Sequence, residues 1–100
     1  MGKAMVARYT TRPDAGDENQ RLVQEVFAQL AEEKPGGLHY LVLRLADGGF
    51  VHLVVLDGEE NGLTGLSNFA EFQRDISSRV AEPPVLTAAT VVGAYGFELA

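Results

Sequence analysis

The segment from Leu38 to Leu56 constrains the fold most, because it is mainly apolar on both sides of a glycine-rich turn at Asp47-Gly48-Gly49. Glycine tolerates the positive φ of a tight turn, and the Val, Leu, Phe and Tyr of the two arms favour β-strands. Neither arm alternates apolar with polar residues, as a strand with one wet face would. We therefore expect an antiparallel hairpin that is buried on both faces.

Length and charge limit the class of protein. A chain of 100 residues is expected to form a single domain, residues 1–100. A net charge of −6 argues against nucleic acid or an anionic membrane as partner, since phosphate binding requires clustered Lys and Arg. The sequence has no cysteine, which excludes disulfides and thiolate catalysis. The N-terminus MGKAMV lacks the apolar core of a signal peptide, and no apolar run is long enough to span a membrane, so a cytoplasmic protein is expected.

Before the hairpin, the sequence predicts one strand and one helix. Residues 4–11 are β-prone, and residues 12–16 read as a loop. Asp17 and Gln20 resemble a capping box, and the residues that follow recur with the spacing of one apolar helical stripe. The helix is expected to stop at Lys34-Pro35-Gly36-Gly37, where glycine can adopt a left-handed cap.

After the hairpin, the sequence predicts a second helix and a last strand. Ser67 is the expected N-cap, and Leu66, Phe69, Phe72, Ile76 and Val80 form an apolar stripe with helical spacing. Pro83-Pro84 is expected to end this helix. Residues 85–99 are expected to form a long final strand.

The resulting order, β-α-β-β-α-β, is the ferredoxin-like arrangement of the α+β class, with a four-stranded antiparallel sheet and two helices on one face. Two helices with one apolar stripe each can cover only one face of this sheet. The other face is also apolar, and a second copy of the sheet is the economical cover. We therefore predict a homodimer closed face to face.

The element order and the segment from Leu63 to Phe72, LTGLSNFAEF, resemble the dimeric α+β barrel superfamily and within it the antibiotic-biosynthesis monooxygenase-like proteins. The resemblance implies two sheets that close into a barrel, with outer helices and a small cavity between the sheets in each subunit. Some such proteins oxidise aromatic polyketides without metal or flavin, and others degrade haem. This chain departs from the catalytic members: Leu56 stands near a frequent Trp, Arg8 stands near a frequent Asn, and the second helix lacks a His.

His52 and Arg8 are the candidate catalytic residues. With a two-residue turn, His52 would face Leu43 and His39 would face Leu56, so the two histidines would lie roughly 13 Å apart, too far to share a metal. His52 could instead act as a base in the cavity, or serve as a hydrogen-bonded core residue. Arg8 could stabilise an enolate, or simply be paired or solvated. The candidate ligand-binding residues, which would share the lumen face with His52, are Leu41, Leu43, Val54 and Leu56.

Two functions remain open. The leading hypothesis is a small-molecule-binding homodimer that oxygenates an aromatic or polyketide-like substrate as a cofactor-independent monooxygenase. No metal, haem or flavin is expected. The alternative is a non-enzymatic regulatory module that binds amino acids near the loop at residues 12–16. RNA binding on the sheet is excluded, because the strands lack stacking aromatics and a basic rim.

Overall fold

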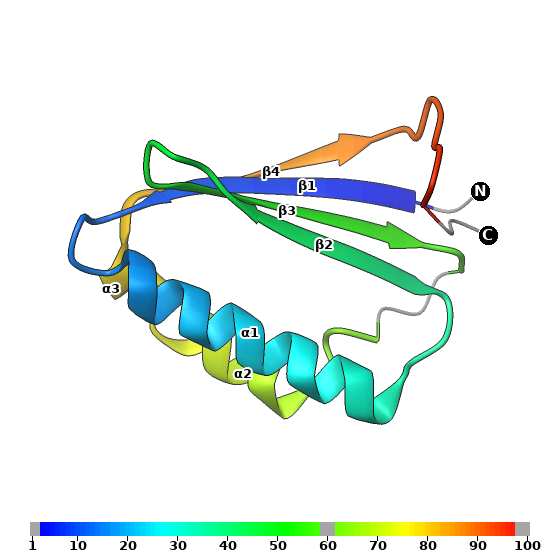
Figure 1. Cartoon of the computed structure of the whole chain (residues 1–100), viewed down its shortest axis with the longest axis horizontal. Helices are drawn as coiled ribbons and strands as arrows, with labels where there is room; N and C mark the ends of the chain where they lie inside the picture. Colours follow the sequence, from blue (N-terminus) through cyan, green and yellow to red (C-terminus); the bar gives the residue numbers. More distant parts are fainter. Residues whose placement is uncertain (1–2, 59–61, 98–100) are drawn as a thin grey trace.

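The structure is a computed structural model that describes residues 3–58 and 62–97. The elements, in chain order, are β1 (Lys3–Thr11), α1 (Gly16–Glu33), β2 (Leu38–Arg44), β3 (Gly49–Leu56), α2 (Ser67–Arg74), α3 (Ile76–Arg79) and β4 (Val80–Ala89). The strands form one antiparallel, four-stranded sheet in the order β2-β3-β1-β4. Helices α1 and α2 lie side by side against one face of this sheet (Figure 1). The predicted α+β βαββαβ fold is confirmed.

The N-terminus of α1 is held by a tertiary contact and not by the predicted capping box. Ala15 is the N-cap residue, and no side chain caps the helix. Asp17 and Gln20 instead accept hydrogen bonds from Nη1 of Arg44 at the end of β2, at 3.0 and 2.8 Å. At the other end of the helix, the left-handed residue is Lys34 at φ 48°, before the glycines that were expected there.

The chain after α2 differs most from expectation. The second helix ends at Arg74, and after the short α3 the chain is extended from Val80 onwards, so that Pro83-Pro84 lies within β4 and does not end a helix. Proline is tolerated there because β4 is an edge strand with few ladder hydrogen bonds to lose. Strand β4 already ends at Ala89, and the described residues 90–97 leave the sheet and turn back at the end where the N-terminus lies (Figure 1).

The β2–β3 hairpin has a three-residue loop, and this shifts its register by one residue from the predicted one. Leu45 and Gly49 face each other through the hydrogen bond from Leu45 N to Gly49 O, so the loop comprises Ala46, Asp47 and Gly48. Gly48 has φ 91°, the left-handed conformation that commonly closes such loops. His52 therefore pairs with Val42 and not with Leu43. A slip of one residue exchanges the two faces of one strand relative to the other.

The two faces of the sheet have different surroundings. The helix face packs against α1 and α2 around a buried core formed by Tyr9, Leu22, Val23, Val26, Phe50, Leu63, Leu66 and Phe72. The opposite face, called the open face below, carries Ala4, Val6 and Arg8 of β1, His39, Leu41 and Leu43 of β2, Val51, Leu53 and Val55 of β3, and Val85, Thr87 and Ala89 of β4. Leu43 and Val85 on this face are 50% and 65% exposed. Within one chain, the helices pack on the helix face of the hairpin, whereas Leu41 and Leu43 of its open face stay exposed.

No helix in the described part of the chain is long and apolar enough to cross a membrane.

Substituting alanine at Gly48 tests the hairpin loop. Gly48→Ala should lower the free energy of unfolding by about 1 kcal/mol, because a Cβ at positive φ is strained. Gly58→Ala is the matched control, since an added Cβ there meets no atom within 4 Å. Urea denaturation of both variants measures the difference. Equal stability of the two variants would contradict the left-handed assignment of Gly48.

Candidate functional site

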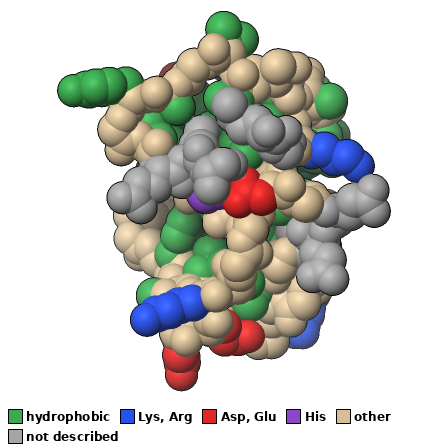
Figure 2. Space-filling view, turned by 90° about the vertical axis from the view of Figure 1, so that its right-hand side faces the viewer, with side chains coloured by type: hydrophobic (Ala, Val, Ile, Leu, Met, Phe, Trp, Pro, Cys, Tyr) green, Lys and Arg blue, Asp and Glu red, His purple; other side chains and the backbone are tan. Residues whose placement is uncertain are grey.

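One hollow lies on the open face, beneath the segment that follows β4. It has a volume of about 690 Å³ and is called the open-face cavity below. The sheet supplies one wall, and residues 89–94 with Phe97 supply the other. Figure 2 looks onto this end of the molecule, where a histidine adjoins an acidic side chain and hydrophobic side chains lie below the histidine. The apolar side chains of the sheet wall are those of Ala4, Leu41, Leu53 and Val55.

A smaller hollow of about 340 Å³ lies between the C-terminal end of α1 and the start of β2. Its lining is mostly apolar, and Lys34 is its charged member. The ring of Tyr40 lines it and stacks on Phe27 with the ring centroids 4.9 Å apart. The hydroxyl of Tyr40 is hydrogen-bonded to His52.

A chain of hydrogen bonds runs through the layer between the sheet and the helices. His52 is 5% exposed, and both its ring nitrogens are occupied. Tyr40 Oη lies 2.6 Å from Nδ1, and Tyr9 Oη lies 2.7 Å from Nε2. Asn19 Nδ2 donates to Tyr9 Oη at 2.9 Å, and Arg79 Nε donates to Asn19 Oδ1 at 3.1 Å. Every polar side chain in this apolar layer thus has a partner, as burial demands.

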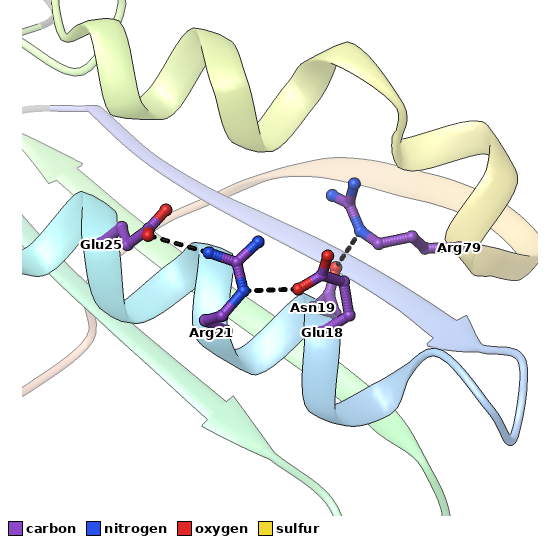
Figure 3. Close-up of polar contacts among 5 residues, drawn as sticks. All are labelled: Glu18, Asn19, Arg21, Glu25 and Arg79. Atoms are coloured by element: carbon purple, nitrogen blue, oxygen red, sulfur yellow. Dashed lines mark hydrogen bonds and ion pairs between the residues drawn. The ribbon is translucent and has the colours of Figure 1, made fainter.

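Arg79, the last residue of α3, begins this chain of hydrogen bonds (Figure 3). Its guanidinium is buried, also donates to the carbonyl oxygen of Phe72, and lies over the Phe72 ring. Burial lowers the pKa of Arg79. The neighbouring Glu18–Arg21–Glu25 ion pairs in Figure 3 are on the exposed surface of α1 and do not join the chain. Arg79 fixes the amide of Asn19, and Asn19 in turn positions Tyr9.

Burial determines the protonation state of His52. Burial lowers its pKa to about 4, so the ring is neutral near pH 7. Burial also raises the pKa of Tyr9 to about 12, with partial opposition from the hydrogen bond of Asn19, and raises the pKa of Tyr40. Because Tyr9 accepts from Asn19, its own proton is free to go to Nε2 of His52, and Nδ1–H then donates to Tyr40. All these groups are neutral.

The predicted pairing of His52 with Arg8 in one cavity is wrong. His52 lies on the helix face, where its ring centroid is 5.4 Å from that of Phe72. Arg8 lies on the open face between Val51 and Val85 and is exposed. Within residues 3–58 and 62–97, Arg8 makes no ion pair shorter than 4 Å. The sheet therefore separates the two side chains, and they cannot act on one molecule within a subunit.

The four predicted ligand-binding residues are divided in the same way by the hairpin register. Leu41 and Leu43 belong to the open face, and Leu41 lines the open-face cavity. Val54 packs against the helix-side core, and Leu56 shares its face. The expectation that all four share one lumen is wrong, because the three-residue loop pairs Val54 with Tyr40 and not with a leucine of the open face.

His39 and Asp57 form a pair that the sequence interpretation missed. His39 Nε2 lies 3.2 Å from Asp57 Oδ2, and the two side chains are 25% and 30% exposed. His39 also lines the open-face cavity. The observed register pairs His39 with Val55, two residues before Asp57, whereas the predicted register set it opposite Leu56. A prediction of the three-residue loop Ala46-Asp47-Gly48 would have brought His39 and Asp57 to one face.

The described part of the chain contains no group of three or more His, Cys, Asp or Glu side chains that could hold a metal ion. The expected absence of metal, haem and flavin stays a prediction.

Comparison with known proteins identifies the fold. No protein-family model and no curated protein matches this sequence. Among solved structures, a Bacteroides thetaiotaomicron protein aligns with TM-score 0.77 and 14% identity over 96% of this chain and 93% of its own. A Nitrosomonas europaea protein aligns with TM-score 0.75 and 13% identity, over 94% and 93%. Both are provisionally named antibiotic biosynthesis monooxygenases. Rv0793 from Mycobacterium tuberculosis aligns with TM-score 0.72 and 18% identity, over 92% and 96%.

The chain thus has the ferredoxin-like fold of the antibiotic biosynthesis monooxygenase proteins, as the sequence resemblance indicated. The protein is similar to them in architecture over nearly its whole length. Identities this low transfer the fold and not the reaction, because function depends on the residues of a site and not on the scaffold.

The low pKa of His52 predicts acid sensitivity. Unfolding restores its pKa from about 4 to the ordinary 6.5, so the unfolded chain binds a proton that the folded chain does not. Stability is therefore full above about pH 6.5 and falls as the pH drops towards 4, by up to roughly 3 kcal/mol. Urea denaturation across this pH range measures the loss. His52→Gln should remove this part of the pH dependence.

His39→Gln is the matched control, because it removes a histidine that is only partly buried. It should retain the parent's fall in stability. A His52→Gln protein with the parent's pH profile would contradict the assignment of a buried, neutral imidazole.

Proposed function

We propose that this protein is a homodimer that binds a small aromatic molecule in the open-face cavity and oxygenates it without metal or flavin. The observation that carries the proposal is the cavity itself: about 690 Å³, lined mainly by apolar groups and carrying few polar ones, chiefly His39 and Thr90. Small-molecule sites typically have this size and composition. A cytoplasmic location stays part of the proposal.

The cavity suits a flat, largely apolar ligand. Leu41, Leu53 and Val55 form an apolar floor on the sheet, and Phe97 offers an aromatic ring from the opposite wall. Burial of apolar ligand surface against such walls contributes about 25 cal/mol per Å². The few polar groups can then fix the orientation of a hydroxyl or carbonyl oxygen.

The homodimer is supported by the apolar remainder of the open face. Leu43 and Val85 are 50% and 65% exposed, and neither lines the cavity. A second copy that covers this surface would bury both side chains and would also enclose the cavity from above. The provisional monooxygenase names of proteins with this fold agree with the proposed oxygenation.

Aspartate substitution tests the dimer. Val85→Asp should dissociate the dimer or weaken it by several kcal/mol, because an unpaired carboxylate would be buried in the interface. Leu86→Asp is the control: Leu86 is equally exposed, at 66%, but faces the other side of β4. Sedimentation equilibrium at micromolar concentration measures both. A monomeric parent protein would refute the dimer.

Ligand binding can be measured with the neutral fluorescent probe N-phenyl-naphthylamine. The probe should bind the parent protein, and Leu41→Trp should weaken binding about tenfold by filling the cavity. Leu43→Trp is the control, on the same strand and face but outside the cavity. Equal affinity of both variants would exclude the open-face cavity as the site.

Oxygenation is decided by turnover of anthrone, an aromatic polyketide-like probe. Reaction with O2 would convert its methylene group to a carbonyl and release one water, giving anthraquinone. An oxygen electrode and mass spectrometry follow this conversion, with and without a metal chelator. Binding without oxygen uptake would instead favour the non-enzymatic ligand-binding function. The sealed position of His52 favours this second candidate, because its nitrogens are already occupied.

A further inference from the structure

The pair of His39 and Asp57 is built by the ends of two neighbouring strands. His39 lies near the start of β2, and Asp57 follows the last residue of β3. The backbone N–H of Asp57 donates to the carbonyl oxygen of Gly37 at 2.9 Å. This hydrogen bond fixes the backbone of Asp57 next to the first residue of β2. His39 pairs with Val55 across the ladder, so Asp57 is its diagonal neighbour on the open face. The pairing of the two strands and the hydrogen bond to Gly37 therefore fix the backbones of His39 and Asp57.

The contact orients the imidazole. With Nε2–H directed at the carboxylate of Asp57, the neutral ring keeps Nδ1 as a hydrogen-bond acceptor. A carboxylate in this position holds the ring in one tautomer and stabilises the imidazolium that forms when the ring takes a proton. His39 lines the open-face cavity and is 25% exposed, whereas His52 is sealed among tyrosines. The pair therefore has the access that the buried histidine lacks.

We propose that His39 and Asp57 accept the proton of an acidic hydroxyl group on a ligand in the open-face cavity. The ligand class is a small aromatic phenol or enol. Its O–H bond breaks, the electron pair stays on the ligand oxygen, and the proton binds Nδ1 of His39. The resulting imidazolium lies between two negative charges, the bound phenolate and Asp57. This inference rests on the proposed function, whose cavity supplies the ligand.

In the described part of the chain, the charges around the pair are few. Of the residues lining the cavity, His39 and Tyr40 are the ones with titratable side chains, and the hydroxyl of Tyr40 is bonded to His52 on the other face. On β1, Arg8 belongs to the hairpin end of the open face, and Lys3 belongs to the helix face. In the segment after β4, Tyr95 is 97% exposed. Within residues 3–58 and 62–97, Asp57 is therefore the charged partner of His39.

The test uses para-nitrophenol, whose ionised form is coloured, and para-nitroanisole, which has no acidic proton. In the parent protein at about pH 6, the phenolate-to-phenol ratio of bound para-nitrophenol should exceed that of the free compound about tenfold, as a nearby positive charge shifts an acid by a pKa unit or more. His39→Gln should abolish the excess, and Asp57→Asn should reduce it. Asp14→Asn, which removes an exposed surface carboxylate, should leave it unchanged.

Para-nitroanisole separates this inference from the proposed function. It should bind the parent, His39→Gln and Asp57→Asn proteins with similar affinity, and thermal melting checks that each variant is folded. If para-nitroanisole binds but bound para-nitrophenol ionises like the free compound, or if His39→Gln keeps the excess, the proton-accepting pair is refuted and the cavity stands. If neither compound binds, both proposals fail.

Discussion

The fold depends on one buried chain of hydrogen bonds, from Arg79 through Asn19 and Tyr9 to His52 and Tyr40. It links the end of α3 to α1 and then to three adjacent strands. This one chain of hydrogen bonds therefore fixes how the helices pack on the sheet. Each member is satisfied, and an unsatisfied partner in this layer would cost about 1–3 kcal/mol. Satisfied networks of this kind specify one arrangement of a core that hydrophobic packing alone would leave less defined.

The sheet divides the molecule into two environments with different chemistry. On the helix face, aromatic rings and the buried chain hold His52 neutral. On the open face, apolar side chains remain exposed, and a partly exposed histidine adjoins a carboxylate at the mouth of a cavity. Burial holds the first histidine in the neutral state, whereas the second lines a cavity and is partly exposed. The two histidines thus lie in opposite environments.

Particular residues show how far the sequence could be interpreted. The apolar stripes of the helices and the β-prone segments predicted the order of elements, since periodicity reflects which side of an element is buried. The last strand was misplaced because Pro83-Pro84 suits an edge strand as well as a helix end. The candidate site was misplaced because the observed loop contains one more residue, Ala46, than the predicted two-residue turn, and this changes which side chains of β2 face His52.

The sequence by itself therefore determined the βαββαβ order, the apolar character of both sheet faces and the presence of two histidines in the central hairpin. Only the tertiary structure decided which histidine is buried and which lines a cavity. The physical reason is that local pattern sets the period of a strand, whereas register, and with it the environment of each side chain, depends on the loop and on the partners across the sheet. The contact between His39 and Asp57 exists only once those strands are paired.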